Sequence, residues 1–530
     1  MNTNTRPFRV GVVGAGVMGR GIAQVMAQSG ADVLLHDAAE NAAGQAVEAV
    51  EQAWQKLAEK GRISDADAVA NRSRMRVAGS LEALSGCNVV IEAIVERLDA
   101  KRSLFAALED IVAADAVLAT NTSSLSVTAI AAACRHPARV AGLHFFNPVP
   151  LMRIVEIIGG VRTSPETLAT LDALVAATGH AGVRVQDTPG FLINHAGRGY
   201  GTEALRVVQE GVASFAEVDA IMREQVRFQG GGFRLGPFEL LDLTGLDVSQ
   251  PVMESIYRQF YDEPRFRPSI IGAQRAAGGL LGRKTGEGFY PYPQAAATRR
   301  PAGTPAVSAG ESATVATGAE ASEGGGVAVP VHVVVEPYAE SLAPLVERLG
   351  ARRVEDPSGC SEGFVLIAPL GEDASRYAAR RGLPAARVVA IDTLFDPAAP
   401  GCARRSLMPT VATDPQALRT AAALFGADGA AVSVLRDSCG FVTQRIVAMI
   451  VAIGCEIAQQ RIAAPGDIDR AVRAGLGYPA GPLAMGDELG PARVLQVLEG
   501  MWAGTGDPRY RPSLWLRRRA ELGLSLQVQD

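Results

Sequence analysis

The chain has 530 residues, of which 48% are hydrophobic and 20% are charged, and its formal net charge is −5. This length predicts several domains, and the composition is that of a soluble globular protein rather than a disordered or fibrous one. The negative charge argues against general binding to nucleic acid or to anionic membranes.

The six cysteines are scattered, with no Cys-x-x-Cys pair and no paired histidines nearby. This pattern favours free thiols in a reducing compartment and indicates no metal site. The amino-terminal stretch has no apolar signal segment, and no uncharged run is long enough to cross a bilayer. We therefore expect a cytoplasmic protein with neither a metal nor a membrane partner.

The first predicted elements are a strand, a glycine-spaced turn and a helix. Residues 8–13 form a short apolar run, and Gly14, Gly16 and Gly19 follow it with the spacing G-x-G-x-x-G. Gly14 permits a tight turn, and Gly16 lets the backbone approach a pyrophosphate. Gly19 lets the helix lie close to the strand. The amino terminus of that helix then faces the phosphates.

An acidic residue at the end of the second predicted strand indicates which dinucleotide binds. Asp37 follows the strand at residues 33–36 and can accept hydrogen bonds from both ribose hydroxyls. Two alanines come next, so no arginine is placed to receive a 2′-phosphate. The cofactor is therefore predicted to be NAD rather than NADP. The predicted contacts in this region are Gly14, Gly16, Val17, Met18, Gly19 and Asp37.

Oxidation of an alcohol needs a proton acceptor, and His144 is the histidine best placed to be one. It ends the apolar run 140–143 and precedes the letters FFNP, which is typical of a strand end in a parallel sheet, where open α/β folds place their chemistry. Glu156 interrupts another apolar run, at residues 154–158, and needs a partner because an unpaired buried charge is costly. We predict that Glu156 pairs with His144 and orients its ring. The alternative is a core histidine and an unrelated strand glutamate.

The chain resembles the 3-hydroxyacyl-CoA dehydrogenase family in four stretches: EAIVERLDAK (92–101), NTSSLSV (121–127), AGLHFFNPVPLMRIVEII (141–158) and DTPGFLIN (187–194). The resemblance runs from residue 7 to about residue 292. It implies a Rossmann-type NAD-binding domain followed by an all-α domain. It also implies an oxidoreductase of the β-oxidation type in fatty acid metabolism, which converts an (S)-3-hydroxyacyl-CoA to the 3-ketoacyl-CoA with NAD.

The resemblance also implies residue roles. His144 becomes the general base and Glu156 its orienting acid, while Ser123 and Asn194 match polar residues near the 3-oxygen of the substrate and the reacting centre. The positions that match the nicotinamide half of the cofactor site are Glu96, Lys101, Ser123 and Asn147. His195 follows Asn194 where the family pattern leads us to expect arginine, which leaves the packing around Asn194 open.

The second half of the chain repeats the first. DSCGFVTQRIVAMI (437–450) matches DTPGFLINHAGRGY (187–200), and GPLAMGDELG (481–490) matches GPFELLDLTG (236–245). The strand expected at residues 332–336 is followed by no glycine turn. Different residues stand at three catalytic positions: Asp392 near the place of His144, Thr410 near that of Glu156, and Gln444 at that of Asn194. The copy is therefore expected neither to bind NAD nor to oxidise a substrate.

The predicted fold class is α/β of the Rossmann type followed by an all-α domain, then a degenerate second copy made of a truncated α/β part and an all-α part. The predicted domains are 1–187 (NAD-binding), 188–292 (helical), 293–327 (flexible linker), 328–436 (degenerate Rossmann-like) and 437–530 (helical). In single-copy relatives the helical domain is a dimer interface. The resemblance therefore implies a pseudo-dimer within one chain and leaves a homo-oligomer of whole chains open.

The expected partner is an acyl-CoA thioester, but the motifs leave the acyl group open. The tandem layout, with RFQGGGFRLGPFELLDLTGLD (227–247), most resembles the dehydrogenases of phenylacetate catabolism, which implies 3-hydroxyadipyl-CoA. Alternatives are 3-hydroxybutyryl-CoA, a free 3-hydroxy acid, and a relative that binds NAD without turnover. Arg234 is a candidate partner for a terminal carboxylate. Alternatively, it is an ordinary surface arginine or an ion-pair partner of Glu239.

Overall fold

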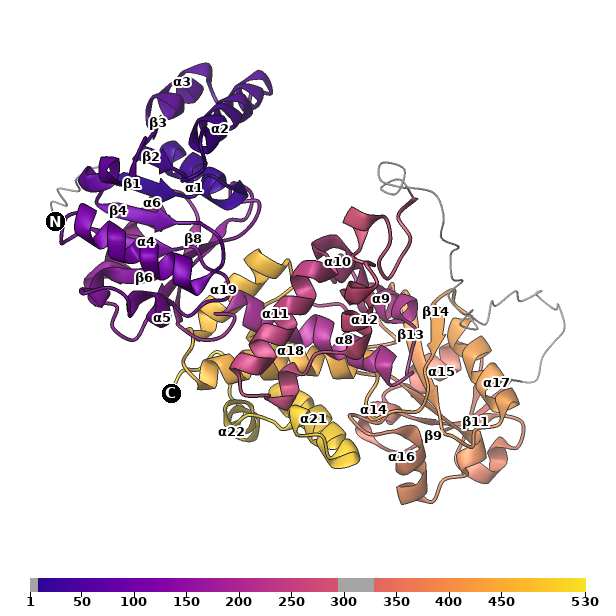
Figure 1. Ribbon diagram of the computed structural model, residues 1–530. Helices are drawn as coiled ribbons and strands as arrows, with labels where there is room; N and C mark the ends of the chain where they lie inside the picture. Colours follow the sequence, from indigo (N-terminus) through magenta and orange to yellow (C-terminus); the bar gives the residue numbers. More distant parts are fainter. Residues whose placement is uncertain (1–7, 294–327) are drawn as a thin grey trace. The chain divides into compact units, whose positions relative to one another are not determined.

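The computed structural model describes residues 8–293 and 328–530, so the predicted linker lies, apart from residue 293, outside the described residues. The described chain is divided into two compact units (Figure 1). The first unit combines Met1–His195 with Gln460–Leu476, and the second combines Ala196–Gln459 with Gly477–Asp530. A helical segment from the second copy therefore belongs to the unit that contains the glycine turn.

An eight-stranded sheet forms the centre of the first unit, with the strand order β3-β2-β1-β4-β5-β6-β7-β8. The strands are β1 (Arg9–Val13), β2 (Asp32–His36), β3 (Met75–Val77), β4 (Val89–Glu92), β5 (Val117–Thr120), β6 (Val140–Phe145), β7 (Ile154–Gly159) and β8 (Ala181–Gln186). From β1 the chain adds strands first on one side and then on the other. This order places a topological switch point at the carboxyl end of β1, where such sheets bind ligands.

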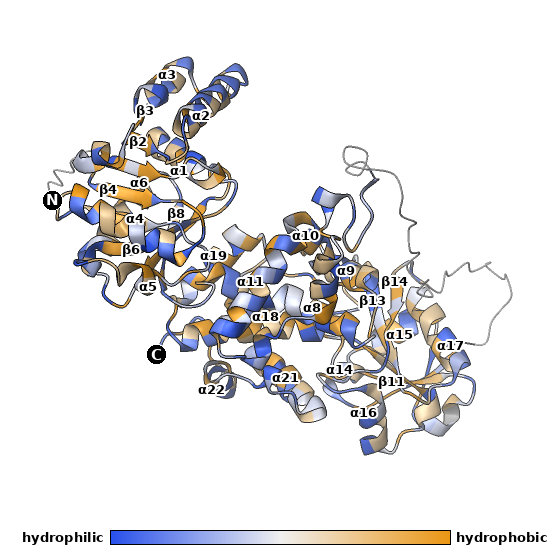
Figure 2. Cartoon of the chain, viewed as in Figure 1, coloured by the Kyte–Doolittle hydropathy of each residue, from blue (hydrophilic) through white to orange (hydrophobic). Residues whose placement is uncertain are grey.

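Helices on both faces of this sheet bury its strands. They are α1 (Val17–Gln28), α2 (Ala42–Glu59), α3 (Asp65–Ser73), α4 (Leu98–Ile111), α5 (Val127–Ala131) and α6 (Pro165–Ala177). Two separate clusters of buried apolar residues result. Strands covered on both faces are apolar along their length, as Figure 2 shows for β1 and β4, whereas α2 and α3 carry many hydrophilic residues.

Two strands of the first sheet, β7 and β8, run opposite to the other six. β6 pairs in parallel with β5 but antiparallel with β7, whereas the sequence led us to expect a parallel sheet at the end of β6. The short β6–β7 connection explains the difference, since a parallel crossover needs a dozen or more residues. The antiparallel register makes His144 and Glu156 direct cross-strand partners.

The segment that joins the first unit from the second copy contains α19 (Pro465–Leu476), which packs against β7 and β8. The backbone N–H of Gln186 donates to the carbonyl of Ile462 at 2.9 Å. The guanidinium of Arg470 donates to the carbonyl of Gly182 at 3.1 Å. The repeat pattern in the sequence contains no signal for this exchange.

The second unit contains the degenerate sheet, with the order β10-β9-β11-β12-β13-β14. Its strands are β9 (Pro330–Val333), β10 (Arg352–Val354), β11 (Phe364–Ile367), β12 (Val388–Ile391), β13 (Arg404–Pro409) and β14 (Ala431–Val434), and its helices are α14 (Pro337–Glu340), α15 (Ala343–Arg348), α16 (Ala374–Arg381) and α17 (Pro415–Gly426). β12 and β13 are antiparallel, as β6 and β7 are. A reciprocal packing also occurs here, because α9 (Phe215–Glu224) of the first copy packs against β13.

The remaining helices of the second unit come from both copies. They are α8 (Arg198–Gln209), α10 (Pro237–Thr244), α11 (Leu246–Gln259), α12 (Ile270–Ala277), α18 (Val442–Gln459), α20 (Pro482–Leu489), α21 (Pro491–Thr505) and α22 (Leu514–Leu522). α18 packs against α8. By length and composition α18 could cross a membrane, but 89% of it is buried inside the protein, so its apolar residues form part of the core.

Buried charges join α8 to α18 and to the carboxy-terminal region. Glu203 accepts hydrogen bonds from Arg445 at 2.8 Å, from Arg509 at 3.3 Å and from the hydroxyl of Tyr510 at 2.8 Å. All four side chains are buried. A carboxylate removed from water requires such partners, so this cluster ties the two copies together at a defined register.

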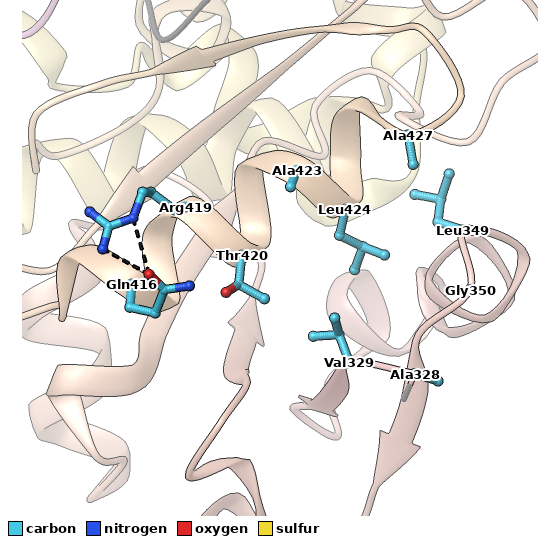
Figure 3. A pocket seen from close by; sticks show the side chains of 10 residues that line it. All are labelled: Ala328, Val329, Leu349, Gly350, Gln416, Arg419, Thr420, Ala423, Leu424 and Ala427. Atoms are coloured by element: carbon cyan, nitrogen blue, oxygen red, sulfur yellow. Dashed lines mark hydrogen bonds between the residues drawn. The ribbon is translucent and has the colours of Figure 1, made fainter. Parts of the chain in front are cut away.

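A pocket of about 470 Å³ lies beside the degenerate sheet, between α17 and the start of β9 (Figure 3). Its lining is mostly small and apolar, and Arg419 within it donates to Gln416. Ala328 and Val329 come before β9, so the pocket lies at the amino end of that strand. Open α/β sheets bind nucleotides at the opposite, carboxyl end. This pocket is therefore not the counterpart of a dinucleotide site.

Candidate active site

The glycine turn has the geometry that an approaching phosphate requires. Gly14 adopts a φ of +105°, and a Cβ there would lie 2.5 Å from the carbonyl oxygen of Ala93. A Cβ on Gly19 would collide with the carbonyl oxygen of Gly14. A Cβ on Gly16, in contrast, would have nothing within 4 Å. Gly14 and Gly19 are therefore needed for packing, whereas Gly16 leaves its backbone open to a ligand.

The start of α1 leaves backbone donors beside this turn. Gly16 is the residue that precedes the helix, and it has no side chain with which to cap it. Val17 and Met18 begin the first turn, and Val17 is 61% exposed. The first N–H groups of a helix have no partner within it and favour an anion, so this end of α1 fits a pyrophosphate.

Asp37 lies directly after β2 and next to the glycine turn. Its carboxylate accepts hydrogen bonds from the N–H of Ala15 at 2.6 Å and from the N–H of Ala39 at 2.8 Å. Gly14 donates its N–H to the carbonyl of His36 at 2.8 Å, which holds the turn against the end of β2. The structure thus brings the predicted phosphate turn and the predicted ribose acceptor together. These residues fit NAD.

His144 and Glu156 form a buried pair. Nδ1 of His144 lies 2.6 Å from Oε2 of Glu156, and the side chains are 6% and 0% exposed. The other oxygen of Glu156 accepts hydrogen bonds from the backbone N–H groups of Leu192 at 2.9 Å and Ile193 at 2.8 Å. Because the carboxylate can only accept, Nδ1 carries the proton and Nε2 is left as the acceptor. The geometry rules out two unrelated core residues.

Aromatic rings flank the imidazole. The ring centroid of Phe146 lies 4.3 Å from that of His144, and the ring centroid of Phe191 lies 5.8 Å from it. Both rings are tilted against the imidazole. The histidine is therefore held by packing as well as by its carboxylate, which fixes the direction of Nε2.

A second buried ion pair lies at the carboxyl end of β4. Nζ of Lys101 lies 2.5 Å from Glu92 and 3.2 Å from Glu96. Glu92 is fully buried and also accepts hydrogen bonds from the hydroxyl of Thr120 at 2.7 Å and the N–H of Ile94 at 2.7 Å. The sequence reasoning missed Glu92, although it interrupts the apolar run 89–95 just as Glu156 interrupts the run 154–158. That shared pattern was the available signal.

Glu96 organises the loop that carries Ser123. One of its oxygens accepts hydrogen bonds from the N–H of Ser123 at 2.9 Å, the hydroxyl of Thr122 at 2.7 Å and the N–H of Ser124 at 3.1 Å. Burial acts to raise the pKa of Glu96, but the hydrogen bonds from Thr122, Ser123 and Ser124 and the charge of Lys101 together outweigh it, so the pKa is lowered. Glu96 therefore stays ionised and fixes the serine loop beside Lys101.

The remaining predicted residues lie near the same edge of the sheet. Ser123 is exposed just after β5, and Asn147 is exposed just after β6. Asn194 is half-buried in the short helix α7 (Ile193–Ala196), next to the buried His195. The carboxyl ends of β4, β5 and β6 thus carry Glu92, Ser123 and His144. Among the described residues, no group of three or more His, Cys, Asp or Glu side chains could hold a metal ion.

The equivalent place in the second copy is filled by side chains from both copies. Asp392 lies opposite Ser406, as His144 lies opposite Glu156, so the expectation that Thr410 stands near the place of Glu156 is wrong. Asp392 is fully buried and accepts hydrogen bonds from Gln225 at 3.0 Å and Gln444 at 3.1 Å, with others from Thr443 and Leu394. Burial raises the pKa of Asp392, although the bonds from Thr443, Leu394 and Gln444 oppose the shift.

Two family models match this chain. The family model described as 3-hydroxyacyl-CoA dehydrogenase, NAD binding domain, matches residues 9–188. The model of the C-terminal domain of the same family matches twice, at residues 190–292 and 440–527, which confirms the internal repeat of the helical part.

Individual relatives cover one copy or the whole tandem chain. A 3-hydroxyadipyl-CoA dehydrogenase of Escherichia coli is 35% identical over 97% of both chains. A probable 3-hydroxybutyryl-CoA dehydrogenase of Deinococcus radiodurans is 40% identical and covers 54% of this chain and 100% of its own length. A crystal structure named 3-hydroxybutyryl-CoA dehydrogenase, from E. coli, covers 98% of this chain and 99% of its own with a TM-score of 0.79 and 33% identity.

Proposed function

Because this chain belongs to the 3-hydroxyacyl-CoA dehydrogenase family, an NAD-dependent group of oxidoreductases, we propose that His144 is the base of its reaction. In this reaction an (S)-3-hydroxyacyl-CoA becomes the 3-ketoacyl-CoA. The single observation that carries the proposal is the 2.6 Å contact between His144 and Glu156, which directs the proton to Nδ1 and leaves Nε2 to accept another.

The chain's own residues handle the proton and the oxygen of the substrate. Nε2 of His144 takes the proton of the 3-hydroxyl, and the imidazolium that forms is stabilised by the Glu156 carboxylate. Ser123 and Asn194 donate hydrogen bonds to the 3-oxygen as it becomes a ketone. NAD, when bound, supplies the acceptor for the hydride.

We assign cofactor binding to the residues at the carboxyl edge of the sheet. Gly16 and the first turn of α1, with Val17 and Met18, hold the pyrophosphate, while Gly14 and Gly19 keep the turn and helix in place. Asp37 accepts hydrogen bonds from the ribose hydroxyls. Glu96, Lys101, Ser123 and Asn147 line the nicotinamide half of the site.

Replacing His144 tests the proposal. His144→Gln should lower kcat by about 10²- to 10⁴-fold while the affinity for NADH, measured by fluorescence titration, stays nearly unchanged, because only proton transfer is lost. The matched control is His136→Gln, since His136 is an exposed residue outside the site. Turnover of the His144 variant close to that of the parent enzyme would dismiss His144 as the base.

For the substrate we propose 3-hydroxyadipyl-CoA, which would place the enzyme in phenylacetate catabolism in the cytoplasm. The support is the end-to-end similarity to a relative that carries this substrate in its name. A second candidate, 3-hydroxybutyryl-CoA, is favoured by the name of the matched crystal structure. The adipyl chain is longer than the butyryl chain and ends in a carboxylate, which needs a partner once it leaves water.

Arg234 is the candidate partner for that carboxylate. It is exposed, and Glu239 forms an ion pair with Arg223 at 3.4 Å, so the predicted alternative pairing of Arg234 with Glu239 is not what the structure contains. Arg234→Met should lower kcat/KM for 3-hydroxyadipyl-CoA by about 2–4 kcal/mol and barely change it for 3-hydroxyhexanoyl-CoA, which lacks only the terminal carboxylate. Equal losses on both substrates would make the arginine structural.

A further inference from the structure

The catalytic pair is supported by a residue of the second copy. Gly475 lies near the end of α19, within the same compact unit as His144 and Glu156. It faces Ile193, whose N–H donates to Glu156 at 2.8 Å. A contact chain thus leads from Gly475 through Ile193 and Glu156 to the ring of His144.

The space at Gly475 admits no side chain. A Cβ there would lie 2.6 Å from Cδ1, 3.2 Å from Cγ2 and 3.3 Å from Cγ1 of Ile193. The nearest atom is the movable end of the isoleucine. The other two are its branch atoms, which are stiff at χ1, so rotating the side chain brings another of its atoms into the same place. A methyl group at residue 475 therefore requires Ile193 to shift, and a shift that reaches its backbone moves the N–H that holds Glu156.

The residue of the first copy that corresponds to Gly475 carries a side chain. This side chain fills the place in the second copy that corresponds to the catalytic pair. α9 begins at Phe215 and α19 at Pro465, so Gln225 stands in the first copy where Gly475 stands in the second. Gln225 donates to Asp392 at 3.0 Å and accepts the hydroxyl of Ser406 at 2.6 Å. Those two residues occupy the places of His144 and Glu156.

We infer that Gly475 is a positioning residue for the catalytic pair, and this rests on the proposed roles of His144 and Glu156. One helix that packs against each α/β sheet comes from the other copy: α19 against the first sheet and α9 against the second. The side chain of Gln225, at the end of α9, fills the place in the second copy that corresponds to the catalytic pair. Gly475, near the end of α19, has no side chain and leaves the backbone under Glu156 undisturbed. The second copy therefore completes the working site although it performs no chemistry of its own.

Glycine-to-alanine variants in the same helix test the inference. Gly475→Ala should lower kcat about 10- to 100-fold and leave the KM for NAD within twofold, because the base is displaced while the cofactor turn is not. Gly466→Ala is the matched control, since a Cβ at Gly466 in α19 would have nothing within 4 Å. Its kcat should stay within twofold of the parent.

A second-site change separates positioning from loss of folding. Ile193→Val removes the Cδ1 atom that a Cβ at residue 475 would contact first, so the double variant should recover at least part of the lost kcat. No recovery in the double variant would overturn the inference, whether or not Gly475→Ala folds well. An unchanged kcat in Gly475→Ala would also overturn it. The proposed function fails separately, if His144→Gln keeps its turnover.

Discussion

The carboxylate of Glu156 can be replaced without removing its hydrogen bonds, which makes it a sharp probe of the catalytic pair. In Glu156→Gln the amide oxygen can still accept the two hydrogen bonds from the N–H groups of Leu192 and Ile193. The amide nitrogen then faces Nδ1 of His144, where the carboxylate oxygen lay at 2.6 Å. An amide nitrogen only donates, so the ring must place its proton on Nε2.

The expected effect is large on turnover and small on stability. With Nε2 protonated the ring cannot accept the substrate proton, and kcat should fall by about 10³- to 10⁴-fold, which is about 4–5.5 kcal/mol of activation free energy. The number of hydrogen bonds stays the same, so the melting temperature should change little. Glu156→Ala would instead leave two N–H groups without an acceptor and destabilise the first unit by roughly 1–3 kcal/mol for each.

The assay is steady-state oxidation of the acyl-CoA substrate, with NADH fluorescence titration for cofactor binding and thermal unfolding for stability. The internal repeat supplies a control, because Ser406 stands in the place of Glu156 in the second copy. Ser406→Ala should leave kcat within twofold of the parent. A kcat for Glu156→Gln within tenfold of the parent would refute the claim that the carboxylate sets the proton position.

Three further outcomes are expected. Asp37→Ala should weaken NAD binding by roughly 1–3 kcal/mol in calorimetry, since a charged acceptor is lost; a parent enzyme that prefers NADPH would contradict this assignment. Calorimetry of the parent should give one NAD site per chain. Two sites of similar affinity would contradict the expectation that the second copy does not bind NAD. Asp392→Ala should lower the unfolding free energy by about 3–5 kcal/mol, because buried donors lose their acceptor, with kcat within twofold. An unchanged melting temperature would show that the filled site adds no stability.

Much of the catalytic region follows from the sequence, because the chemistry leaves few solutions. A carboxylate such as Glu156 inside an apolar strand must find a partner, and only His144 was placed at a nearby strand end. Gly14, Gly16 and Asp37 could also be predicted from the sequence, since a dinucleotide-binding turn requires particular residue types at particular spacings.

Other features were not readable, for different physical reasons. The match of Thr410 to Glu156 failed because a strand repeats every two residues, so a slip of four keeps the same face. The offset of 250 residues that relates 187–200 to 437–450 leads to Ser406, and the pairing register confirms it. The exchange of α19 had no local signal, because an amphipathic helix shows which face it buries and not which surface receives it. Gly475 alone looked like an ordinary helix residue until its neighbour Ile193 was known.

The charge cluster of Glu203, Arg445, Arg509 and Tyr510 shows what covalent fusion of two copies permits. In a symmetric homodimer every substitution appears twice, on both sides of the axis. Here residue 445 is arginine while its counterpart is His195, and residue 203 is glutamate while its counterpart is Ile453. The Glu203–Arg445 ion pair is therefore not repeated by its counterpart residues, whereas Arg265, the counterpart of Arg509, pairs with Glu456 instead. Fusion has released the interface from self-complementarity, and each copy can specialise without imposing the same change on its twin.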